Sequence, residues 1–226
     1  MNKKYAILFV LCLTFVVCCV NDNLRNYPES LEKSNVNSHL LETISGNPVF
    51  LNNFTLWKLI EHGTRQDAEE ILSICKENKY NMVSSMILGI ATWKGMAYEA
   101  GVTSYGDHAF ENDASGYPNP LEPIVTSGND FNDPEQYDFW DHVEYIIDLA
   151  AKKGMYIGLH PAWGNWFSGY VHGQKPEDIM LFDEFKAYKY GQWLGQKFGN
   201  KKKCNLDARW GSIGNLRFKD KVVYSN

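Results

Sequence analysis

Strand-like and helix-like segments alternate along this chain, and that order restricts its fold more than any other feature. Apolar runs predict the strands, and apolar residues at helical spacing predict the helices. In chain order, the predicted segments are strand 49–51, helix 64–78, strand 81–88, helix 133–154, strand 155–159 and helix 176–198. Such an order produces right-handed βαβ units around a parallel sheet, whose binding sites lie where the strands end.

Capping residues indicate where the helices begin and end. Thr64, with Asp67 three residues later, predicts a capping box. Asp133 followed by Pro134 is expected to begin the second helix, and Gly154 to end it.

Size and charge limit the class of protein. The chain has 226 residues, whereas a complete (β/α)8 barrel usually needs about 250. Its formal net charge of −5 argues against non-specific nucleic-acid binding. We find no phosphate-binding glycine loop, metal-binding histidine pair or nucleophile elbow, so we expect no cofactor and no metal.

The first residues resemble an export signal. Two lysines precede an apolar run over 5–17, which is too short to cross a bilayer as an ordinary helix. Cys18 and Cys19 follow this run and predict a bacterial lipoprotein, with Cys19 the better lipidation site; plain secretion is the alternative. We therefore expect a signal over 1–19, a linker over 20–39, and a periplasmic or cell-surface location.

Aromatic and polar side chains follow the predicted strands. Aromatic faces beside hydrogen-bonding groups suit sugars, which present C–H patches and hydroxyls. The candidate saccharide-binding residues are Trp57, Tyr105, Asp107, His160, Trp163 and Trp166. The alternatives are that the tryptophans seal the core, that His160 is a satisfied buried histidine, and that Asp107 caps a turn.

The chain resembles the apiosidase-like (β/α)8-barrel glycoside hydrolases. The resemblance covers residues 40–202 in the order of that family. It is carried by Thr55-Leu56-Trp57, Tyr105-Gly106, Pro161-Ala162-Trp163-Gly164 and the segments 46–50, 142–148, 154–159 and 190–195. It implies an α/β fold, here an incomplete TIM-type barrel of about the first three βα units. It also implies an exported bacterial enzyme that cleaves O-glycosidic bonds in plant-type polysaccharides without a metal.

Two departures from the family pattern matter. Phe54 stands where the family usually has an Asp, so we expect a polar contact at the barrel mouth to be lost. The family also continues beyond its third helix with a strand ending in Gly-Gly-Asp-Arg, whose Asp resembles one catalytic carboxylate. The second catalytic acid lies further on. Neither is matched here, so no catalytic residue is assigned.

The C-terminal segment has a different composition. Residues 201–226 carry seven basic and two acidic side chains, although the whole chain is acidic. A back-translation from Lys202, with chosen synonymous codons, reads Lys-Asn-Val-Ile-Trp-Met-Leu-Gly-Gly-Asp when shifted by one base. We therefore expect residues 203–226 to be out of frame, through a genuine lesion or a sequencing error; a basic extension is the alternative.

These observations together predict a truncated, inactive glycoside hydrolase-like protein whose partner is an oligosaccharide or polysaccharide. The membrane is expected to be contacted only through the N-terminal lipid. A lipid-anchored, non-catalytic carbohydrate-binding protein is the main alternative, and a membrane-surface adhesin is a weaker one.

Overall fold

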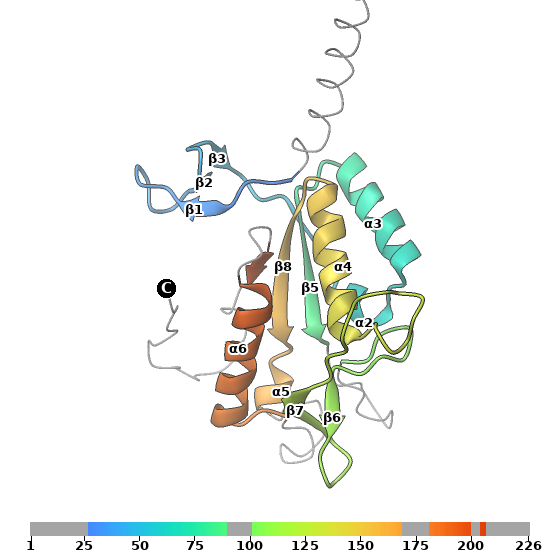
Figure 1. The fold of residues 1–226 in the computed structure, drawn as a ribbon. Helices are drawn as coiled ribbons and strands as arrows, with labels where there is room; N and C mark the ends of the chain where they lie inside the picture. The colour runs from blue at the N-terminus through green and yellow to red at the C-terminus, as the bar shows by residue number, and fades with distance from the viewer. Residues whose placement is uncertain (1–26, 90–100, 169–180, 200–203, 207–226) are drawn as a thin grey trace, which may run out of the picture.

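A four-stranded parallel sheet forms the centre of the computed structural model, which describes residues 27–89, 101–168, 181–199 and 204–206 (Figure 1). Its strand order is β4-β5-β8-β9. The strands are β4 (Asn53–Thr55), β5 (Met82–Leu88), β8 (Tyr156–Ala162) and β9 (Cys204–Leu206). All three pairings are parallel, as the alternating sequence predicted. Among the described strands, the sheet is open.

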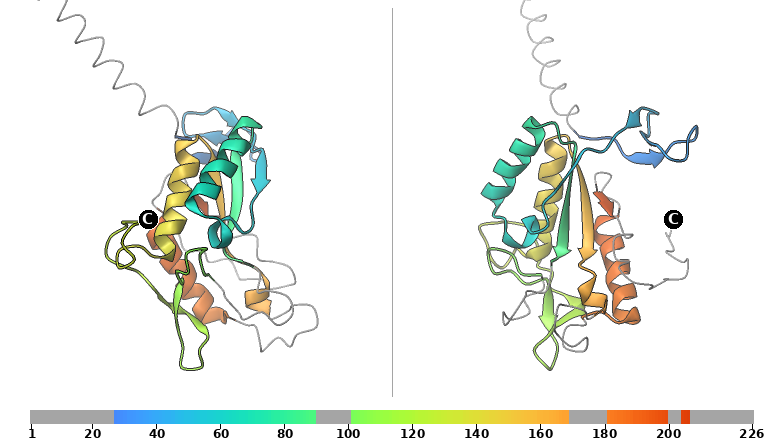
Figure 2. Two further views of the ribbon diagram at one scale, coloured as in Figure 1. Left: turned by 90° about the vertical axis from the view of Figure 1, so that its right-hand side faces the viewer. Right: turned by 180° about the vertical axis from the view of Figure 1, so that it is seen from behind.

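Helices connect the parallel strands. Short α2 (Leu59–His62) and then α3 (Arg65–Glu77) lead from β4 to β5, and α4 (Phe139–Lys152) leads from β5 to β8. Short α5 (Asn165–Ser168) and α6 (Glu184–Phe198) follow β8. Figure 2 shows α3 and α4 side by side against one face of the sheet. The capping box of Thr64 and Asp67 is present as predicted.

Two antiparallel sheets accompany the parallel one. The first contains β1 (Leu31–Lys33), β2 (Leu41–Thr43) and β3 (Pro48–Val49), and the second is the hairpin of β6 (Phe110–Asn112) and β7 (Pro118–Pro123). Figure 1 shows the first beside the amino ends of β5 and β8 and the hairpin at their carboxyl ends. The hairpin occupies part of the long loop that the sequence predicted after the second strand.

The structure corrects the predicted start of the fold. The segment 49–51 was expected to be the first parallel strand, but Val49 pairs with Leu41 in an antiparallel register, and the first parallel strand is β4. Residues 20–39 were expected to be a linker, yet Leu31–Lys33 form a strand paired with β2. The hydroxyl of Tyr156 also donates to the carbonyl of Glu29 at 2.9 Å, which attaches this segment to the parallel sheet.

Two predicted helix starts are also wrong. The second helix begins after Asp138, whose Oδ1 accepts from the N–H groups of Trp140 and Asp141, and not at Asp133. Asp133 instead accepts from the N–H of Glu135 within a turn. The third helix begins after Asp183 rather than near residue 176, which lies outside the described residues.

Side chains from α3, α4 and α6 bury one face of the sheet. Ala68, Leu72 and Cys75 of α3 and nine residues of α4 are buried, and the core is continuous with Val83, Ile87, Ile157 and Leu159 of the strands. Trp140, Val143, Ile147 and Ala150 are fully buried, as their helical spacing predicted. Gly154, with φ +70°, follows the end of α4.

Three residues from the segment expected to be out of frame contribute a strand. Cys204–Leu206 pair in parallel with Ile157–Leu159, which extends the sheet beyond the three expected strands. The signal 1–19, with Cys19, and residues 207–226 lie outside the described residues. No helix in the described part of the chain has the length and apolar character to cross a membrane.

Candidate functional site

Three aromatic side chains meet at the carboxyl end of the parallel sheet. The ring of Trp57, which follows β4, lies 5.2 Å from that of Trp163 in an edge-to-face arrangement, and 5.8 Å from that of His160. Trp57 is 38% exposed, Trp163 is half-buried and His160 is buried. We call Trp57, His160 and Trp163 the aromatic cluster.

Strand alternation determines which face of the sheet carries His160. In β5 and β8, Val83, Ile87, Ile157 and Leu159 face the helices and belong to the main core. His160 pairs with Met86 at the intervening positions, so these two side chains point to the opposite face. Helices α3 and α4 do not cover the face of the sheet to which His160 and Met86 point.

Backbone hydrogen bonds connect the other two members of the cluster to β5. The N–H of Trp163 donates to the carbonyl of Leu88 at 3.0 Å, and the carbonyl of Trp57 accepts from the N–H of Met86 at 3.3 Å. Strand β5 therefore positions the aromatic residues of both neighbouring strand ends.

Trp166 has the environment of a core side chain. It is 3% exposed, and its indole N–H donates to the carbonyl of Gly89 at 2.6 Å. Its own carbonyl accepts from the N–H groups of Leu181 and Phe182, both at 3.0 Å. The sequence placed Trp166 among the stacking candidates, but the structure gives it no exposed ring face, so we leave it out of the aromatic cluster.

Tyr105 and Asp107 lie apart from this cluster. The hydroxyl of Tyr105 accepts from the N–H of Arg65 at 2.8 Å, and its ring contacts that of His142 in α4, so it packs against the helices. Asp107 accepts at Oδ2 from the hydroxyl of Thr103 at 3.0 Å, and its N–H donates to the same hydroxyl oxygen. Asp107 therefore caps a turn, which was the alternative interpretation of this acid.

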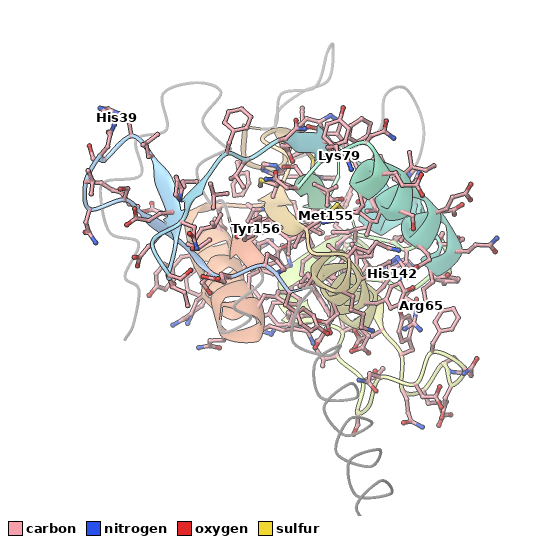
Figure 3. The ribbon with its side chains drawn as sticks, turned by 90° about the horizontal axis from the view of Figure 1, so that it is seen from above. His39, Arg65, Lys79, His142, Met155 and Tyr156 are labelled. Carbon is pink, nitrogen blue, oxygen red and sulfur yellow. The ribbon has the colours of Figure 1, made fainter. Side chains whose placement is uncertain are left out.

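Sequence reasoning did not identify the environment of Arg65. Its guanidinium lies over the rings of Phe131, Tyr145 and Tyr137 at 4.1, 4.2 and 4.8 Å, and its Nε donates to the hydroxyl of Tyr137. Figure 3 shows Arg65 and His142 on the same side of the molecule. Because the rings come from α4 and the loop before it, far from Arg65 along the chain, no local motif signals this arrangement.

Burial shifts the pKa values of the groups around Arg65. Burial is the main reason that the pKa of His142 is lowered to about 4, and the positive charge of Arg65 lowers this pKa as well. The hydrogen bond with the Gly63 carbonyl acts in the opposite direction and raises it. Burial also raises the pKa of Tyr137 to about 12. Since the Gly63 carbonyl only accepts, His142 Nε2 carries the proton and Nδ1 accepts from the hydroxyl of Tyr137. This is a neutral, structural histidine.

A buried carboxylate, Glu61, was also missed by sequence reasoning. Its side chain is 3% exposed and lies 2.6 Å from the Nζ of Lys58. Its Oε1 accepts from the backbone N–H groups of Gly89 at 2.8 Å and of Gly101 at 3.2 Å. Glu61 is thus engaged in structural hydrogen bonds.

Phe54 faces away from the aromatic cluster. It pairs with Val83, so it points toward α3, and its ring packs edge-to-face on Tyr80 at 5.0 Å. An apolar hollow of about 510 Å³ adjoins it, lined also by Leu56, Ile71 and Cys75. Phe54 therefore lies on the helix-covered face and not beside the aromatic cluster, and the loss of a polar contact relative to the family's Asp stays a prediction.

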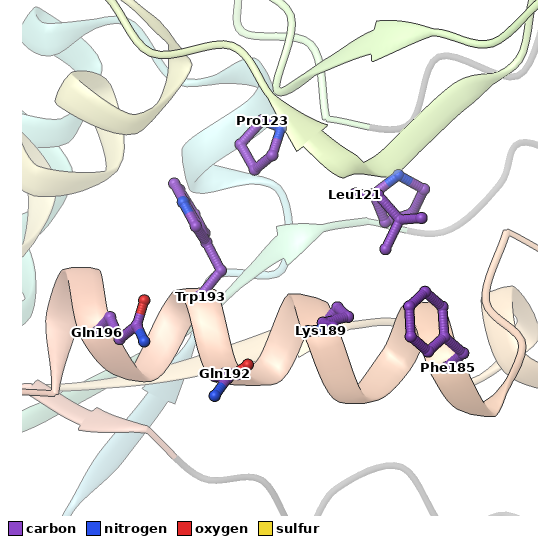
Figure 4. Close-up of a pocket in the computed structure, with 8 residues that line it drawn as sticks. Leu121, Pro123, Phe185, Lys189, Gln192, Trp193 and Gln196 are labelled. Carbon is purple, nitrogen blue, oxygen red and sulfur yellow. The ribbon is translucent and has the colours of Figure 1, made fainter.

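A second hollow lies between β7 and α6 and contains none of the predicted site residues (Figure 4). Its volume is about 380 Å³, and its lining includes Leu121, Phe185, Lys189, Gln192 and Trp193. Among the described residues, no group of three His, Cys, Asp or Glu side chains is arranged to hold a metal ion.

The fold and the aromatic cluster define a class of protein. A parallel βα sheet whose candidate binding residues lie at the carboxyl ends of its strands is the arrangement of (β/α)-barrel-type proteins, which place their sites at that face. Residues 35–205 match the family described as apiosidase-like, catalytic domain. The chain belongs to this apiosidase-like family.

Solved structures support the fold. A family 5 glycoside hydrolase from Bacteroides vulgatus is similar at 24% identity with a TM-score of 0.59, over 80% of this chain and 34% of that one. A second glycoside hydrolase is similar at 25% identity with a TM-score of 0.55, over 79% of this chain and 33% of that one. The chain thus spans about a third of the length of these proteins. No curated protein matches it.

Proposed function

We propose that this chain is the N-terminal part of an exported glycoside hydrolase, and that its aromatic cluster binds saccharide. The observation that carries the proposal is the contact between Trp57 and Trp163 at the strand ends of an apiosidase-like domain. The indole rings provide a flat apolar surface on which a sugar ring can stack, and the imidazole provides a hydrogen-bonding group for a sugar hydroxyl. Both features suit a saccharide site.

The substrate class that we propose is a plant-type polysaccharide with O-glycosidic bonds, and no turnover is expected from this chain. Glycoside hydrolysis requires two carboxyl groups across the scissile bond, about 5 Å apart for retention or wider for inversion. The resemblance assigns both acids to sequence beyond the third helix. Glu61, the acid nearest to Trp57 along the chain, is engaged in structural hydrogen bonds.

Export and lipidation at Cys19 belong to the same proposal and are supported by the sequence of the first twenty residues. A frame break near Lys203 is supported by the reversed charge of residues 201–226. Resequencing the DNA across Lys201–Gly211 tests the frame: codons that exclude the shifted reading would overturn it, and a continuation encoding the remaining strands would support it.

The second candidate is a non-catalytic, lipid-anchored carbohydrate-binding protein. The 38% exposure of Trp57 favours it, because this ring can contact a sugar without any chemistry. The two candidates share the binding surface and differ in the encoded continuation, which the resequencing reveals.

Binding is tested with soluble pectin, xyloglucan and galactomannan, titrated against the folded, monodisperse chain, with reducing sugar measured in parallel. We expect binding without turnover, and at least about tenfold weaker binding for Trp163→Ala. Tyr117→Ala is the matched control, because this exposed ring lies in the β6–β7 connection. Equal binding by wild type and Trp163→Ala would reject the aromatic cluster as the binding surface. If the chain turns over a polysaccharide, and a substitution that neutralises an acid upstream of Lys201 abolishes this turnover, the proposal that the chain is inactive is rejected.

A further inference from the structure

Glu61 connects three segments at the carboxyl end of the sheet. It lies in α2, directly after the segment that carries Trp57, and its Oε2 is 2.6 Å from Lys58 Nζ. Its Oε1 accepts from Gly89 at the end of β5 and from Gly101, where the described chain resumes. One buried carboxylate therefore fixes the positions of both glycines.

Gly89 in turn holds the segment that follows β8. Its carbonyl accepts the 2.6 Å hydrogen bond from the indole N–H of Trp166, while the carbonyl of the preceding residue, Leu88, accepts from the N–H of Trp163. Gly89, directly after β5, thus links Glu61 with Trp166, and its neighbour Leu88, the last residue of β5, holds Trp163.

The space around Gly89 and Gly101 shows how closely this arrangement is packed. A Cβ at Gly89 would come within 2.1 Å of Glu61 Oε2 and 2.5 Å of Lys58 Nζ. Gly101 has φ +67°, and a Cβ there would lie 2.7 Å from both Ala109 and Leu88. Gly101 requires glycine because of its positive φ and these close neighbours, whereas a side chain at Gly89 would displace the ends of the Glu61 and Lys58 side chains.

The buried negative charge of Glu61 also favours a role in fixing the positions of the two glycines. The carboxylate is nine-tenths or more buried, and a buried charge is stable only when it is paired and hydrogen-bonded. Lys58 provides the pairing, and the two N–H groups provide charge-assisted hydrogen bonds. Removing the acceptor would leave two buried N–H groups without partners, so the local geometry depends on Glu61.

We propose that Glu61 is a positioning residue for the aromatic cluster: through Gly89 it fixes the end of β5, which holds Trp163 of the cluster and the neighbouring core residue Trp166. This inference rests on the proposed function for its purpose, but its geometry is testable without any saccharide.

The test compares two substitutions at one position. Glu61→Asp keeps the charge but withdraws the carboxylate by one methylene, so it can no longer reach both glycines. Glu61→Gln keeps the length and an acceptor oxygen. Glu69→Gln is the matched control, because Glu69 also forms an ion pair, with Lys153, and is exposed.

Two measurements on the full chain report the local geometry. Amide exchange is followed at Gly89 and Gly101, and fluorine NMR is recorded with 5-fluorotryptophan, with resonances assigned by Trp→Phe variants. In Glu61→Asp we expect about tenfold faster exchange at both glycines and moved or broadened Trp163 and Trp166 resonances. In Glu61→Gln exchange should stay within about threefold of wild type. Trp140, whose indole N–H donates to Ala109, should not move in any variant.

Unchanged exchange and unchanged resonances in Glu61→Asp would overturn the proposal. So would a moved Trp140 resonance in both Glu61 variants, which would indicate general loss of packing. If Glu61→Asp does not fold, the wild type decides: Gly89 and Gly101 amides that exchange as freely as exposed amides would contradict the assignment. If wild type binds a polysaccharide of the panel, Glu61→Asp should bind it at least about threefold more weakly than Glu69→Gln. Failure of wild type to bind would refute the proposed function and leave the exchange result unaffected.

Discussion

The hydroxyl of Ser84 donates a hydrogen bond of 3.0 Å to Oδ1 of Asn53, which joins the first two parallel strands through their side chains. The next residue, Ser85, points to the helix-covered face and is fully buried. Its hydroxyl has no hydrogen-bond partner, alone among the buried side-chain polar atoms of the described residues. Two adjacent serines thus have opposite hydrogen-bonding states.

This difference predicts opposite effects of the same substitution. Ser84→Ala should lower the free energy of unfolding by about 1 kcal/mol, because it leaves the Asn53 amide oxygen without this donor. Ser85→Ala should leave the free energy unchanged or raise it by up to about 1 kcal/mol, because it removes an unsatisfied buried hydroxyl. Urea unfolding midpoints measure both. A larger loss for Ser85→Ala than for Ser84→Ala would contradict the assignment.

His142 predicts a pH-dependent stability. Its pKa is about 4 in the folded chain, whereas an ordinary histidine has a pKa of about 6.5, so between these values the unfolded state binds the proton more readily. Stability is therefore complete above about pH 6.5 and should fall as the pH drops toward 4. The limiting contribution is on the order of 3 kcal/mol.

His142→Gln isolates this contribution. Carboxylates with a lowered pKa, such as Asp67 beside Thr64, also reduce stability in acid, but they do so in both proteins. The difference in urea midpoint between wild type and variant should therefore shrink from pH 7 to pH 4.5. His62→Gln, at an exposed position in α2, is the matched control substitution. A difference that stays constant with pH would show that the pKa of His142 is the same in the folded and the unfolded chain.

Arg65 predicts a distinction between two cations. Arg65→Lys keeps the positive charge but loses the planar group that lies over three rings and the Nε donor to Tyr137. We expect a loss of about 1–2 kcal/mol in the free energy of unfolding. Lys153→Met, which breaks the ion pair with exposed Glu69, should cost less than about 1 kcal/mol. If Arg65→Lys is as stable as wild type, the positive charge alone accounts for the stabilisation and the planar guanidinium is not needed.

Strands β5 and β8 and the helices α3, α4 and α6 were predictable because each depends on local periodicity, whereas β4 and β9 were not predicted. The Thr64–Asp67 capping box and the buried α4 residues Trp140, Val143, Ile147 and Ala150 are examples, since short-range spacing determines them. The small antiparallel sheet was missed because β1 and β2 are three residues each, and their stability comes from pairing that no single segment reveals.

The candidate site was predictable only in part. Trp57 and Trp163 follow strand ends as predicted, whereas His160 lies within β8, which ends at Ala162 and not at residue 159; the three rings meet at this edge of the sheet. Tyr105 and Asp107 belong to the long segment between β5 and α4. The conformation of this segment depends on contacts with residues far away in the sequence, such as the hydrogen bond from Arg65 to Tyr105. Glu61 was missed because nothing in a Leu-Ile-Glu-His sequence distinguishes a buried carboxylate from an exposed one.

The start of α4 supports a last prediction, which compares two aspartates that the sequence alone could not separate. Asp138 is 3% exposed, and its carboxylate accepts from the N–H groups of Trp140 and Asp141 at Oδ1 and from the N–H of Thr126 at Oδ2. Asp133 accepts within an exposed turn. Asp138→Ala should therefore lower the free energy of unfolding by about 2 kcal/mol or more, because it removes a helix cap and leaves buried N–H donors without an acceptor. Asp133→Ala should lower it by less than about 1 kcal/mol. Urea unfolding of both variants decides between the two helix starts: a larger loss for Asp133→Ala would place the cap where the Asp-Pro pair first indicated it.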